Sequence, residues 1–410
     1  VVLVRVDHNV VKKGGIKDPY RIDSTIGTII NIYARGGRPI LMTHVGRPKD
    51  KKTGEITISD NTSVQPVVEY LRNKLNLNIE APAFTKDEKK GYTQIDAFIQ
   101  DKIKDLKEGK IDMIYLPNTR WFYGEENKGE ESDRMAKQMA ELADVFVNDA
   151  FGSWQAHTST VSINKHLPSY AGLLMQKEIK NLQRIFNPEK PFVSVVAGAK
   201  FDTKADSLYA LLERSDYLAL GGVIYNAYLC AKYDISIEGV SEEDVKVAKE
   251  FIDYAGKYQD KILELPYIIE SDTMEGKIEG KYREHDVREL KPGTKLNYVL
   301  DISEKSFRED KVESAFSKAK TIFTNAVMGL TPHFAEGTIA LDKLIDSNKD
   351  AMKLFGGGDT NQELKTLLPG VYMKAVDDPA YYLFTGGGAV LKAIQEGTTE
   401  GLEPVKALIK

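Results

Sequence analysis

Cysteine is almost absent from this sequence: among 410 residues there is one, Cys230. A single cysteine excludes an intramolecular disulfide, so nothing indicates an oxidising compartment. Long apolar runs are missing as well, since no stretch approaches the roughly 20 residues that a membrane-spanning helix needs. No secretory signal peptide is visible, although the strand-like start VVLVRVD has no initiator Met and a preceding segment stays open. These absences favour a cytoplasmic protein that does not bind membranes.

An excess of positive charge is also missing. The chain has 56 Lys and Arg against 61 Asp and Glu, which gives a formal net charge of −5. A mildly acidic protein has no bulk attraction for nucleic acid, so any anion that it binds must meet a local basic patch. Hydrophobic content of 42% and charged content of 29% are ordinary for a globular protein. A chain of 410 residues is too long for one hydrophobic core, and two domains are expected.

Short runs rich in β-branched residues alternate with longer amphipathic stretches along the chain. The alternation predicts βαβ units, and therefore parallel sheets covered by helices on both faces. Apolar residues at helical spacing over 171–186, stopped by Pro188, predict a helix that joins two lobes. The charged, glycine-containing stretch 264–295 indicates surface loops and edge structure. The predicted strands are 1–6, 39–43, 111–116, 144–147, 192–196, 217–220, 296–300, 321–323, 352–355 and 381–384, and the clearest predicted helices are 64–74, 133–142, 204–214 and 242–258.

Charged side chains follow the predicted strands of the first half. Ligands of open parallel sheets bind beyond the carboxyl ends of the strands. Arginine suits an anion there because its planar fork grips phosphate or carboxylate with two parallel bonds. Each cation alone is more often a solvated surface charge, but several at successive strand ends of an acidic protein favour an anion site. The candidates are Arg21, His44, Arg47 and Arg120.

Glycines follow the predicted strands of the second half. They let the backbone approach a phosphate closely, and the bare amides at a helix N-terminus attract anions. Lys204 adds a point charge, and Asp359 is suited to Mg²⁺ that keeps most of its waters. One glycine triplet is weak evidence, because tight strand–helix turns use glycine anyway. The turns are Gly198 with Lys200, Gly221-Gly222, Asn325 to Gly329, Gly356-Gly357-Gly358 before Asp359-Thr360, and Gly386-Gly387-Gly388.

The common catalytic motifs are absent. Neither GxxxxGK[ST] nor GxGxxG fits the glycine-rich turns, and there is no HExxH zinc motif or GxSxG hydrolase turn. The remaining histidines, His157 and His166 among them, are isolated, and a lone histidine is more often structural than a metal ligand.

Eight ordered motifs carry a resemblance to a known family. RVDHN, the Tyr20-Arg21-Ile22 segment, THVGRP, NTRWF, VNDAFG, GAKFDTK, GGGDT and TGGGA occur in one order from Val1 towards the closing GLEPVKAL segment. In sequence, order and approximate spacing they resemble phosphoglycerate kinases. The match covers nearly the whole chain and is specific.

The resemblance implies an α/β protein with two Rossmann-like lobes built on parallel sheets, joined by an interdomain helix and a hinge. The implied lobes are 1–170, with 398–410 packing back on it, and 188–397, with the helix at 171–187. The implied substrates are 3-phosphoglycerate on the first lobe and ATP or ADP with Mg²⁺ on the second. Asp7, Asn9, Arg21, His44, Arg47 and Arg120 would hold the acid, and Gly198, Lys200, Lys204, Gly222, Asn325, Gly357, Gly358, Asp359 and Thr360 would hold the nucleotide, with Asp359 on the metal.

The implied reaction is the reversible phosphoryl transfer of glycolysis and gluconeogenesis between 1,3-bisphosphoglycerate and MgADP. Such transfer needs an in-line approach and neutralisation of the negative charge spread over the phosphoryl oxygens. No covalent intermediate on the protein is needed. Arg21, Lys204 and the amides of Gly386, Gly387 and Gly388 would supply that charge after the hinge closes and excludes water. The expected oligomeric state is a monomer or a weak homodimer.

Several positions depart from the family pattern, mostly on the nucleoside side. Gln155 stands where the family has an arginine, so one phosphate contact is expected to be lost. Pro332 replaces a glutamate expected on the ribose hydroxyls, at a cost of about 1–3 kcal/mol if those hydroxyls stay buried. Val223 and Ser303 each replace a glycine. Two alternatives stay open: a kinase with an altered nucleotide or acid substrate, and a non-catalytic relative that binds phosphoglycerate.

Overall fold

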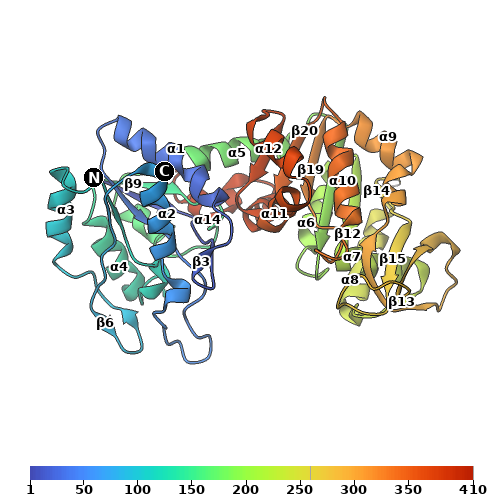
Figure 1. The fold of residues 1–410 in the computed structure, drawn as a ribbon, viewed down its shortest axis with the longest axis horizontal. Coiled ribbons are helices and arrows are strands. Elements are labelled where there is room, and N and C mark those ends of the chain that lie inside the picture. Colours follow the sequence, from blue (N-terminus) through green and yellow to red (C-terminus); the bar gives the residue numbers. More distant parts are fainter. Residues whose placement is uncertain (259, 410) are drawn as a thin grey trace. The chain divides into compact units, whose positions relative to one another are not determined.

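The computed structural model describes residues 1–258 and 260–409. The chain divides into two units, Val1–Lys180 together with Thr399–Lys410, and Asn181–Thr398. Each unit is built around a sheet of six strands that are all parallel (Figure 1). The predicted α/β class with two parallel sheets is confirmed. Among the described residues, no helix is long and apolar enough to cross a membrane.

The sheet of the first unit has the strand order β10-β9-β1-β4-β8-β5. Its central strands are mostly apolar because helices cover both faces, with Arg5 of β1 as a charged exception. Helix α5 (Leu173–Phe186) follows β10 at the end of this unit. The strands are β1 (Val2–Val6), β4 (Pro39–Met42), β5 (Ile79–Glu80), β8 (Met113–Tyr115), β9 (Val145–Asp149) and β10 (Ser169–Ala171), and the other helices are α1 (Tyr20–Ala34), α2 (Gln65–Leu75), α3 (Ile99–Lys107), α4 (Glu130–Ala140) and α14 (Glu403–Lys406).

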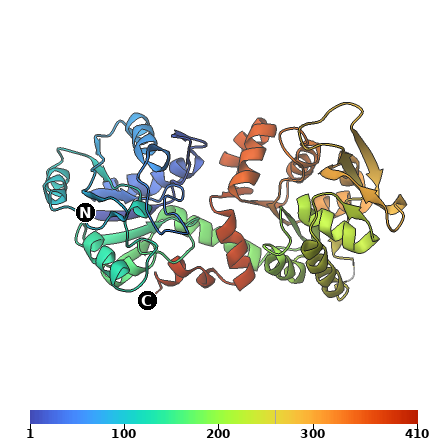
Figure 2. The same cartoon turned by 90° about the horizontal axis from the view of Figure 1, so that it is seen from below.

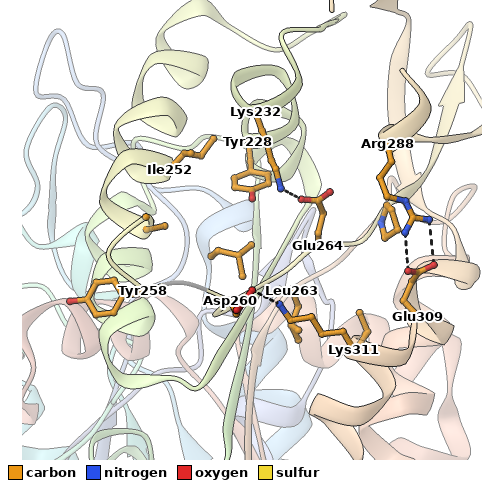
Figure 3. A pocket seen from close by; sticks show the side chains of 15 residues that line it. Tyr228, Lys232, Ile252, Tyr258, Asp260, Leu263, Glu264, Arg288, Glu309 and Lys311 are labelled. Carbon is orange, nitrogen blue, oxygen red and sulfur yellow. Dashed lines mark hydrogen bonds and ion pairs between the residues drawn. The ribbon is translucent and has the colours of Figure 1, made fainter. Parts of the chain in front are cut away.

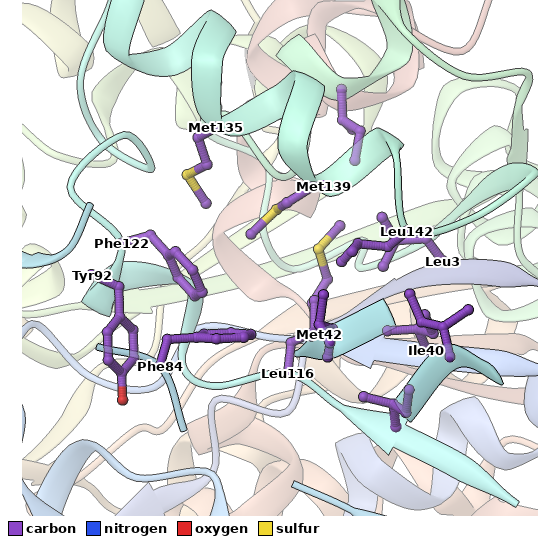
Figure 4. Packing of buried hydrophobic residues seen from close by; sticks show 14 of the residues in the cluster. Leu3, Ile40, Met42, Phe84, Tyr92, Leu116, Phe122, Met135, Met139 and Leu142 are labelled. Carbon is purple, nitrogen blue, oxygen red and sulfur yellow. The ribbon is translucent and has the colours of Figure 1, made fainter. Parts of the chain in front are cut away.

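Successive residues of one strand enter different apolar clusters on the two faces of this sheet. Leu3 belongs to one cluster and Val4 to the other, as the two-residue period of a strand requires. Figure 4 shows the first cluster, in which Met139 of helix α4 lies close to Met42 of strand β4. Both residues are fully buried. The sheet therefore separates two hydrophobic cores that cover both of its faces. Only the edges of the sheet remain free to bind a ligand.

The sheet of the second unit has the strand order β14-β12-β11-β19-β20-β21. Helices α6, α7, α8 and α13 pack together over one face, and helices α9 to α12 pack together over the other (Figure 2). The strands are β11 (Phe192–Gly198), β12 (Tyr217–Gly221), β14 (Ile262–Leu263), β19 (Thr321–Asn325), β20 (Met352–Gly356) and β21 (Tyr381–Phe384). The helices are α6 (Ala205–Arg214), α7 (Gly222–Tyr233), α8 (Glu242–Ala255), α9 (Asp310–Lys318), α10 (Glu336–Ser347), α11 (Gly358–Leu367), α12 (Pro369–Asp377) and α13 (Gly387–Glu396).

Two predictions about the second unit were only partly right. The strand expected at 296–300 does not join the parallel sheet, because β18 (Tyr298–Ile302) pairs antiparallel with β15 (Tyr267–Ser271). The stretch 264–295, expected as loops and edges, supplies β15 as the central strand and β16 (Tyr282–Asp286) as an outer one (Figure 1). Glu270 of β15 is 3% exposed and accepts hydrogen bonds from Arg283 Nε at 2.7 Å and from the Asn297 amide at 2.7 Å. A buried carboxylate with such partners belongs to a core, although its charge suggests a surface.

We expect the stability of the second unit to fall as pH rises because of Asp342 in helix α10. Burial, with the nearby Glu363 carboxylate adding repulsion, raises the pKa of Asp342 to about 8. Between about pH 4 and that pKa the folded state holds a proton that the unfolded state has lost, so stability declines by up to about 1.4 kcal/mol per pH unit. Asp342→Asn should remove this slope in urea unfolding measured at pH 5 and pH 8. The exposed Asp377→Asn is the matched control, and an unchanged slope in Asp342→Asn would contradict the assignment.

Candidate active site

Strand β1 of the first unit ends at an ion pair between Asp7 and Arg21. Asp7 directly follows the strand and is 4% exposed. Arg21, in the first turn of helix α1, donates from Nη1 to Asp7 Oδ2 at 3.2 Å. The Arg21 side chain keeps 26% exposure, so part of it stays accessible while it is paired with a buried carboxylate. The pair places a fixed cation at the carboxyl edge of the sheet.

The loop after strand β4 is held by two more predicted site residues. The Gly46 amide donates to Asn9 Oδ1 at 2.9 Å, and Arg120 Nη1 donates to the Gly46 carbonyl oxygen at 2.6 Å. Arg120 Nε also lies 3.0 Å from Glu126 Oε1. Arg47 is exposed one residue after Gly46. The structure thus brings Asn9 and Arg120 onto one loop and leaves the Arg47 side chain accessible beside them.

His44 lies in the same cluster as a neutral side chain. It is 9% exposed, and its Nδ1 lies 2.9 Å from Arg5 Nη2. Burial first, and then the positive charges of Arg5 and Arg120, hold the pKa of His44 well below its ordinary value of 6.5. Arg21 is among the charges that depress it, so these groups share one electrostatic environment. A neutral imidazole among arginines can donate one hydrogen bond without adding repulsion.

The sequence prediction missed Arg5 as a member of this site. Arg5 is fully buried within strand β1, and its Nε donates to Ser159 Oγ at 2.9 Å. Ser159 lies on the loop that follows Gln155, the position where the family resemblance led us to expect an arginine. Gln155 itself is exposed, and its backbone oxygen accepts a bond from Thr160 Oγ1 at 2.9 Å. The available signal was a single charged residue inside the apolar run VVLVRV.

Glycines and helix N-termini gather at the carboxyl edge of the second sheet. Helix α7 begins directly after strand β12, helix α11 two residues after β20 and helix α13 three residues after β21. Because these strands are parallel, the free amides of all three helices lie at one edge, where the helix dipoles favour an anion. Gly222 has φ +62° and pairs with Gly198, so the first turn is tight.

Asn325, the last residue of strand β19, connects two of these turns. Lys204 Nζ donates to Asn325 Oδ1 at 3.1 Å, and Asn325 Nδ2 donates to the Gly356 carbonyl oxygen. Burial lowers the pKa of Lys204, whose side chain also packs against Gly198. The Asn325 side chain therefore bonds both to the Lys204 ammonium and to the glycine-rich turn at Gly356, and fixes their positions relative to each other. The arrangement offers a phosphate one point charge and several backbone donors.

Two glycines of neighbouring turns touch through their backbones. A Cβ on Gly387 would lie 2.6 Å from Gly357 Cα and 3.1 Å from Asn325 Nδ2. Gly357 has φ +126°, a conformation that only glycine adopts readily. Gly386 is buried and Gly388 is exposed at the start of helix α13. The closeness of the two turns explains why neither carries a side chain.

Asp359 and Thr360 stand in the first turn of helix α11. The Asp359 side chain is exposed, whereas Thr360 is 5% exposed. No group of three or more His, Cys, Asp or Glu side chains that could hold a metal occurs within residues 1–258 and 260–409. A single carboxylate fits Mg²⁺, which usually keeps several waters and is held by one or two carboxylates together with substrate phosphates. Lys200 and Val223 lie exposed and half-buried near the first two turns.

The remaining nucleoside-side departures occupy the loops around this edge. Ser303 is buried and caps a short 3-10 helix (Glu304–Arg308), with its hydroxyl donating to Glu284. Pro332 is exposed in the segment between strand β19 and helix α10. The structure places no carboxylate at position 332, and the serine hydroxyl is already engaged.

A separate cavity of about 510 Å³ lies between helices α7 and α8 and strand β14. Figure 3 shows its charged groups paired with one another: Lys232 with Glu264, Arg288 with Glu309 at 3.0 Å, and Lys311 with Asp260 at 3.7 Å. None of the predicted site residues lines it. Its paired charges give it no net attraction for an anion, and we place no chemistry there.

We expect Gly387→Ala to damage the second cluster selectively. The added methyl group would collide with the Gly357 backbone, which cannot move aside as a flexible side chain can. We expect kcat to fall at least about 10-fold, because the resemblance assigns the displaced amides to stabilising the charge that develops in the transition state. Gly370→Ala in helix α12 is the control, since a Cβ there meets nothing within 4 Å. Steady-state kinetics of both variants, with thermal unfolding to confirm the fold, would show whether the two glycines differ; equal activity would contradict the assignment.

Comparisons of the sequence and of the structure with known proteins find the same family. The family model described as phosphoglycerate kinase matches residues 1–397. Proteins with the name "Phosphoglycerate kinase" include that of Limosilactobacillus reuteri subsp. reuteri (strain JCM 1112), 32% identical over 418 residues, 98% of this chain and 96% of that protein. Another, from Roseiflexus sp. (strain RS-1), is 34% identical over 400 residues, 96% and 93% of the two chains. The solved phosphoglycerate kinase from Coxiella burnetii has a TM-score of 0.76 and 27% identity, and the alignment covers 99% of this chain and 95% of that one.

Proposed function

Because the chain belongs to the phosphoglycerate kinase family, a family of phosphotransferases with ATP or ADP as co-substrate, we propose that its two residue clusters divide the reaction between them. The first unit binds the acid, 3-phosphoglycerate or 1,3-bisphosphoglycerate, and the second binds the nucleotide. The observation that carries this division is the contrast between the clusters. One consists of arginines and a neutral histidine, and the other consists of glycine turns, helix N-termini and Lys204.

In the first unit the acid lies against side chains. Asp7 anchors Arg21 and Asn9 holds the Gly46 loop, so that arginine forks and the His44 ring N–H meet the carboxylate and phosphate oxygens. Gln155 supplies no charge, so the acid relies on fewer cations than in relatives with arginine there. The proposed acid-binding residues are Asp7, Asn9, Arg21, His44, Arg47 and Arg120.

In the second unit the nucleotide phosphates lie against backbone amides and Lys204. Asp359 would hold Mg²⁺, which when bound would supply neutralising positive charge to the phosphates. Pro332 has no polar side-chain group and the Ser303 hydroxyl is bonded to Glu284, which supports a relaxed or altered nucleoside preference. The proposed nucleotide-binding residues are Gly198, Lys200, Lys204, Gly222, Asn325, Gly357, Gly358, Asp359 and Thr360.

Transfer is direct and in line. A β-phosphate oxygen of ADP attacks the acyl phosphorus of 1,3-bisphosphoglycerate, the bond from phosphorus to the carboxyl oxygen breaks, and 3-phosphoglycerate leaves as a carboxylate. Arg21, Lys204 and the amides of Gly386, Gly387 and Gly388 stabilise the phosphoryl oxygens in flight. Closure of lobes 1–170 and 188–397 about the helix 171–187, with 398–410 returning to the first lobe, brings the substrates together and excludes water. We propose a cytoplasmic enzyme that acts as a monomer or weak homodimer.

A coupled assay tests the proposal directly. The protein is given 3-phosphoglycerate and Mg²⁺ with ATP, GTP, CTP or UTP in parallel reactions, and production of the corresponding nucleoside diphosphate is followed. Turnover with ATP is expected, and a ranking in which GTP approaches ATP would reflect the altered nucleoside contacts. Folded protein that binds 3-phosphoglycerate in calorimetry but turns over with none of the four would favour a non-catalytic relative. Turnover that requires a different acid would favour an altered acid substrate.

A further inference from the structure

A buried chain of polar groups stands behind His44. Arg5, Ser159 and Glu125 are each fully buried. Arg5 Nη2 lies 2.9 Å from His44 Nδ1, and Arg5 Nε donates to Ser159 Oγ at 2.9 Å. Ser159 Oγ donates to Glu125 Oε1 at 2.6 Å, and its backbone amide donates to Glu125 Oε2 at 2.9 Å. The chain runs from strand β1 through the loop at Ser159 to the segment before helix α4, and none of it reaches solvent.

The direction of every bond in this chain follows from one residue. A guanidinium has only donors, so His44 Nδ1 must accept from Arg5 and carries no proton. The Ser159 hydroxyl accepts from Arg5 and passes its own proton towards Glu125. The His44 proton therefore belongs on Nε2, at the opposite side of the ring from Arg5. Arg5 itself has no exposed atoms with which to touch a substrate.

We infer that Arg5 is a positioning residue for the acid substrate: it holds His44 as the neutral tautomer with its proton on Nε2, aimed to donate to a carboxylate or phosphate oxygen. The inference rests on the proposed function, which places His44 in the acid site. Glu125 supplies the negative charge that lets Arg5 stay buried, and Ser159 connects the two. The other charged or titratable groups acting on the His44 ring are Arg21, Arg120 and His157.

The tautomer can be measured in the wild-type protein. With ¹⁵N-labelled histidine, NMR distinguishes a protonated ring nitrogen from an unprotonated one. We expect His44 to show a proton on Nε2 and none on Nδ1, without titration between pH 5 and pH 8. A proton on Nδ1, or a histidine that becomes cationic near neutral pH, would overturn the inference. This result stands even if the Arg5 variants fail to fold.

A double-mutant cycle tests whether Arg5 acts through His44. Arg5→Met should weaken binding of 3-phosphoglycerate, measured by calorimetry, by about 10- to 100-fold, while nucleotide binding stays unchanged. It should also mix the tautomers and let His44 titrate, so that binding becomes pH-dependent. In a His44→Gln background the same change should cost less than about 3-fold. Equal losses in both backgrounds would overturn the positioning role.

Arg5→Lys separates charge from geometry. Lysine keeps the buried positive charge but cannot bond His44 and Ser159 through a rigid fork. We expect it to recover only part of the affinity; full recovery would mean that the charge alone matters and would overturn the inference. Because the readout is binding of 3-phosphoglycerate, it does not depend on turnover. Wild-type protein that binds 3-phosphoglycerate but transfers no phosphoryl group would count against the proposed function. The role of Arg5 would then be decided by the NMR measurement and the double-mutant cycle.

Discussion

Arg21→Ala should lower kcat by about 100- to 1,000-fold while the protein stays folded. Arg21 is held by Asp7 Oδ2 at 3.2 Å but keeps a quarter of its side chain accessible, so its free N–H groups are available to the phosphoryl oxygens. Its contribution grows as negative charge spreads over those oxygens. The loss should therefore appear mainly in kcat, measured in the coupled assay at saturating substrates. A modest drop in thermal midpoint is expected as well, because the buried Asp7 loses its partner.

Arg35→Ala is the matched control for this variant. Arg35 is exposed at the far end of the same helix, α1, and plays no part in the site. It should retain full activity. If Arg21→Ala retained activity within about 3-fold of the wild type, Arg21 would have to be removed from the catalytic residues.

Lys204→Ala should have an effect of similar size, about 100- to 1,000-fold on kcat, with affinity for 3-phosphoglycerate unchanged. The lysine Nζ is held by Asn325 Oδ1 at 3.1 Å beside the glycine turns, so its removal deletes a fixed positive charge from that cluster. Burial lowers the pKa of Lys204. In the free enzyme the ammonium is therefore lost at lower pH than an exposed lysine would lose it. The alkaline limb of kcat/KM for the nucleotide should report this loss.

Two further variants make the Lys204 result interpretable. Lys249→Ala, exposed on helix α8, should leave the kinetics unchanged. Lys204→Arg keeps the charge at all accessible pH values, because a guanidinium does not deprotonate. It should move the alkaline limb to higher pH even if its activity is lower. An alkaline limb at the same pH in Lys204→Arg would assign the titration to another group.

The parallel sheets could be predicted because their strands are short apolar runs that alternate with amphipathic helices. The three-stranded sheet of β15, β16 and β18 could not. Its strand β15 carries Glu270, and a carboxylate in a charged stretch indicates solvent unless its partners are known. Those partners, Arg283 and the Asn297 amide, lie 13 and 27 residues away in the chain and approach only after folding. Edge strands of two or three residues, such as β14, are likewise too short to show a period.

The proposed anion-binding residues could be chosen from the sequence because they follow strand ends, where parallel sheets place their ligands. Arg21, Arg120 and Lys204 are visible as charges at those points. Arg5 is different, since it lies inside a strand and acts on another side chain. The sequence does not show that Ser159 and Glu125, more than 100 residues away, complete its environment. Candidate ligand-binding positions can thus be proposed from their place in the sheet, whereas a residue that orients a neighbouring side chain is recognised only in the packed structure.

The segment Thr399–Lys410 belongs to the same unit as Val1–Lys180. Within it, Leu402 and Val405 are 1% and 5% exposed. During synthesis on the ribosome, the first unit must therefore wait for more than 200 residues of the second before its last buried side chains emerge. A nascent chain released before residue 399 would hold a finished second unit and an unfinished first one. Vectorial translation thus sets the order of completion, and the unit that begins first is completed last.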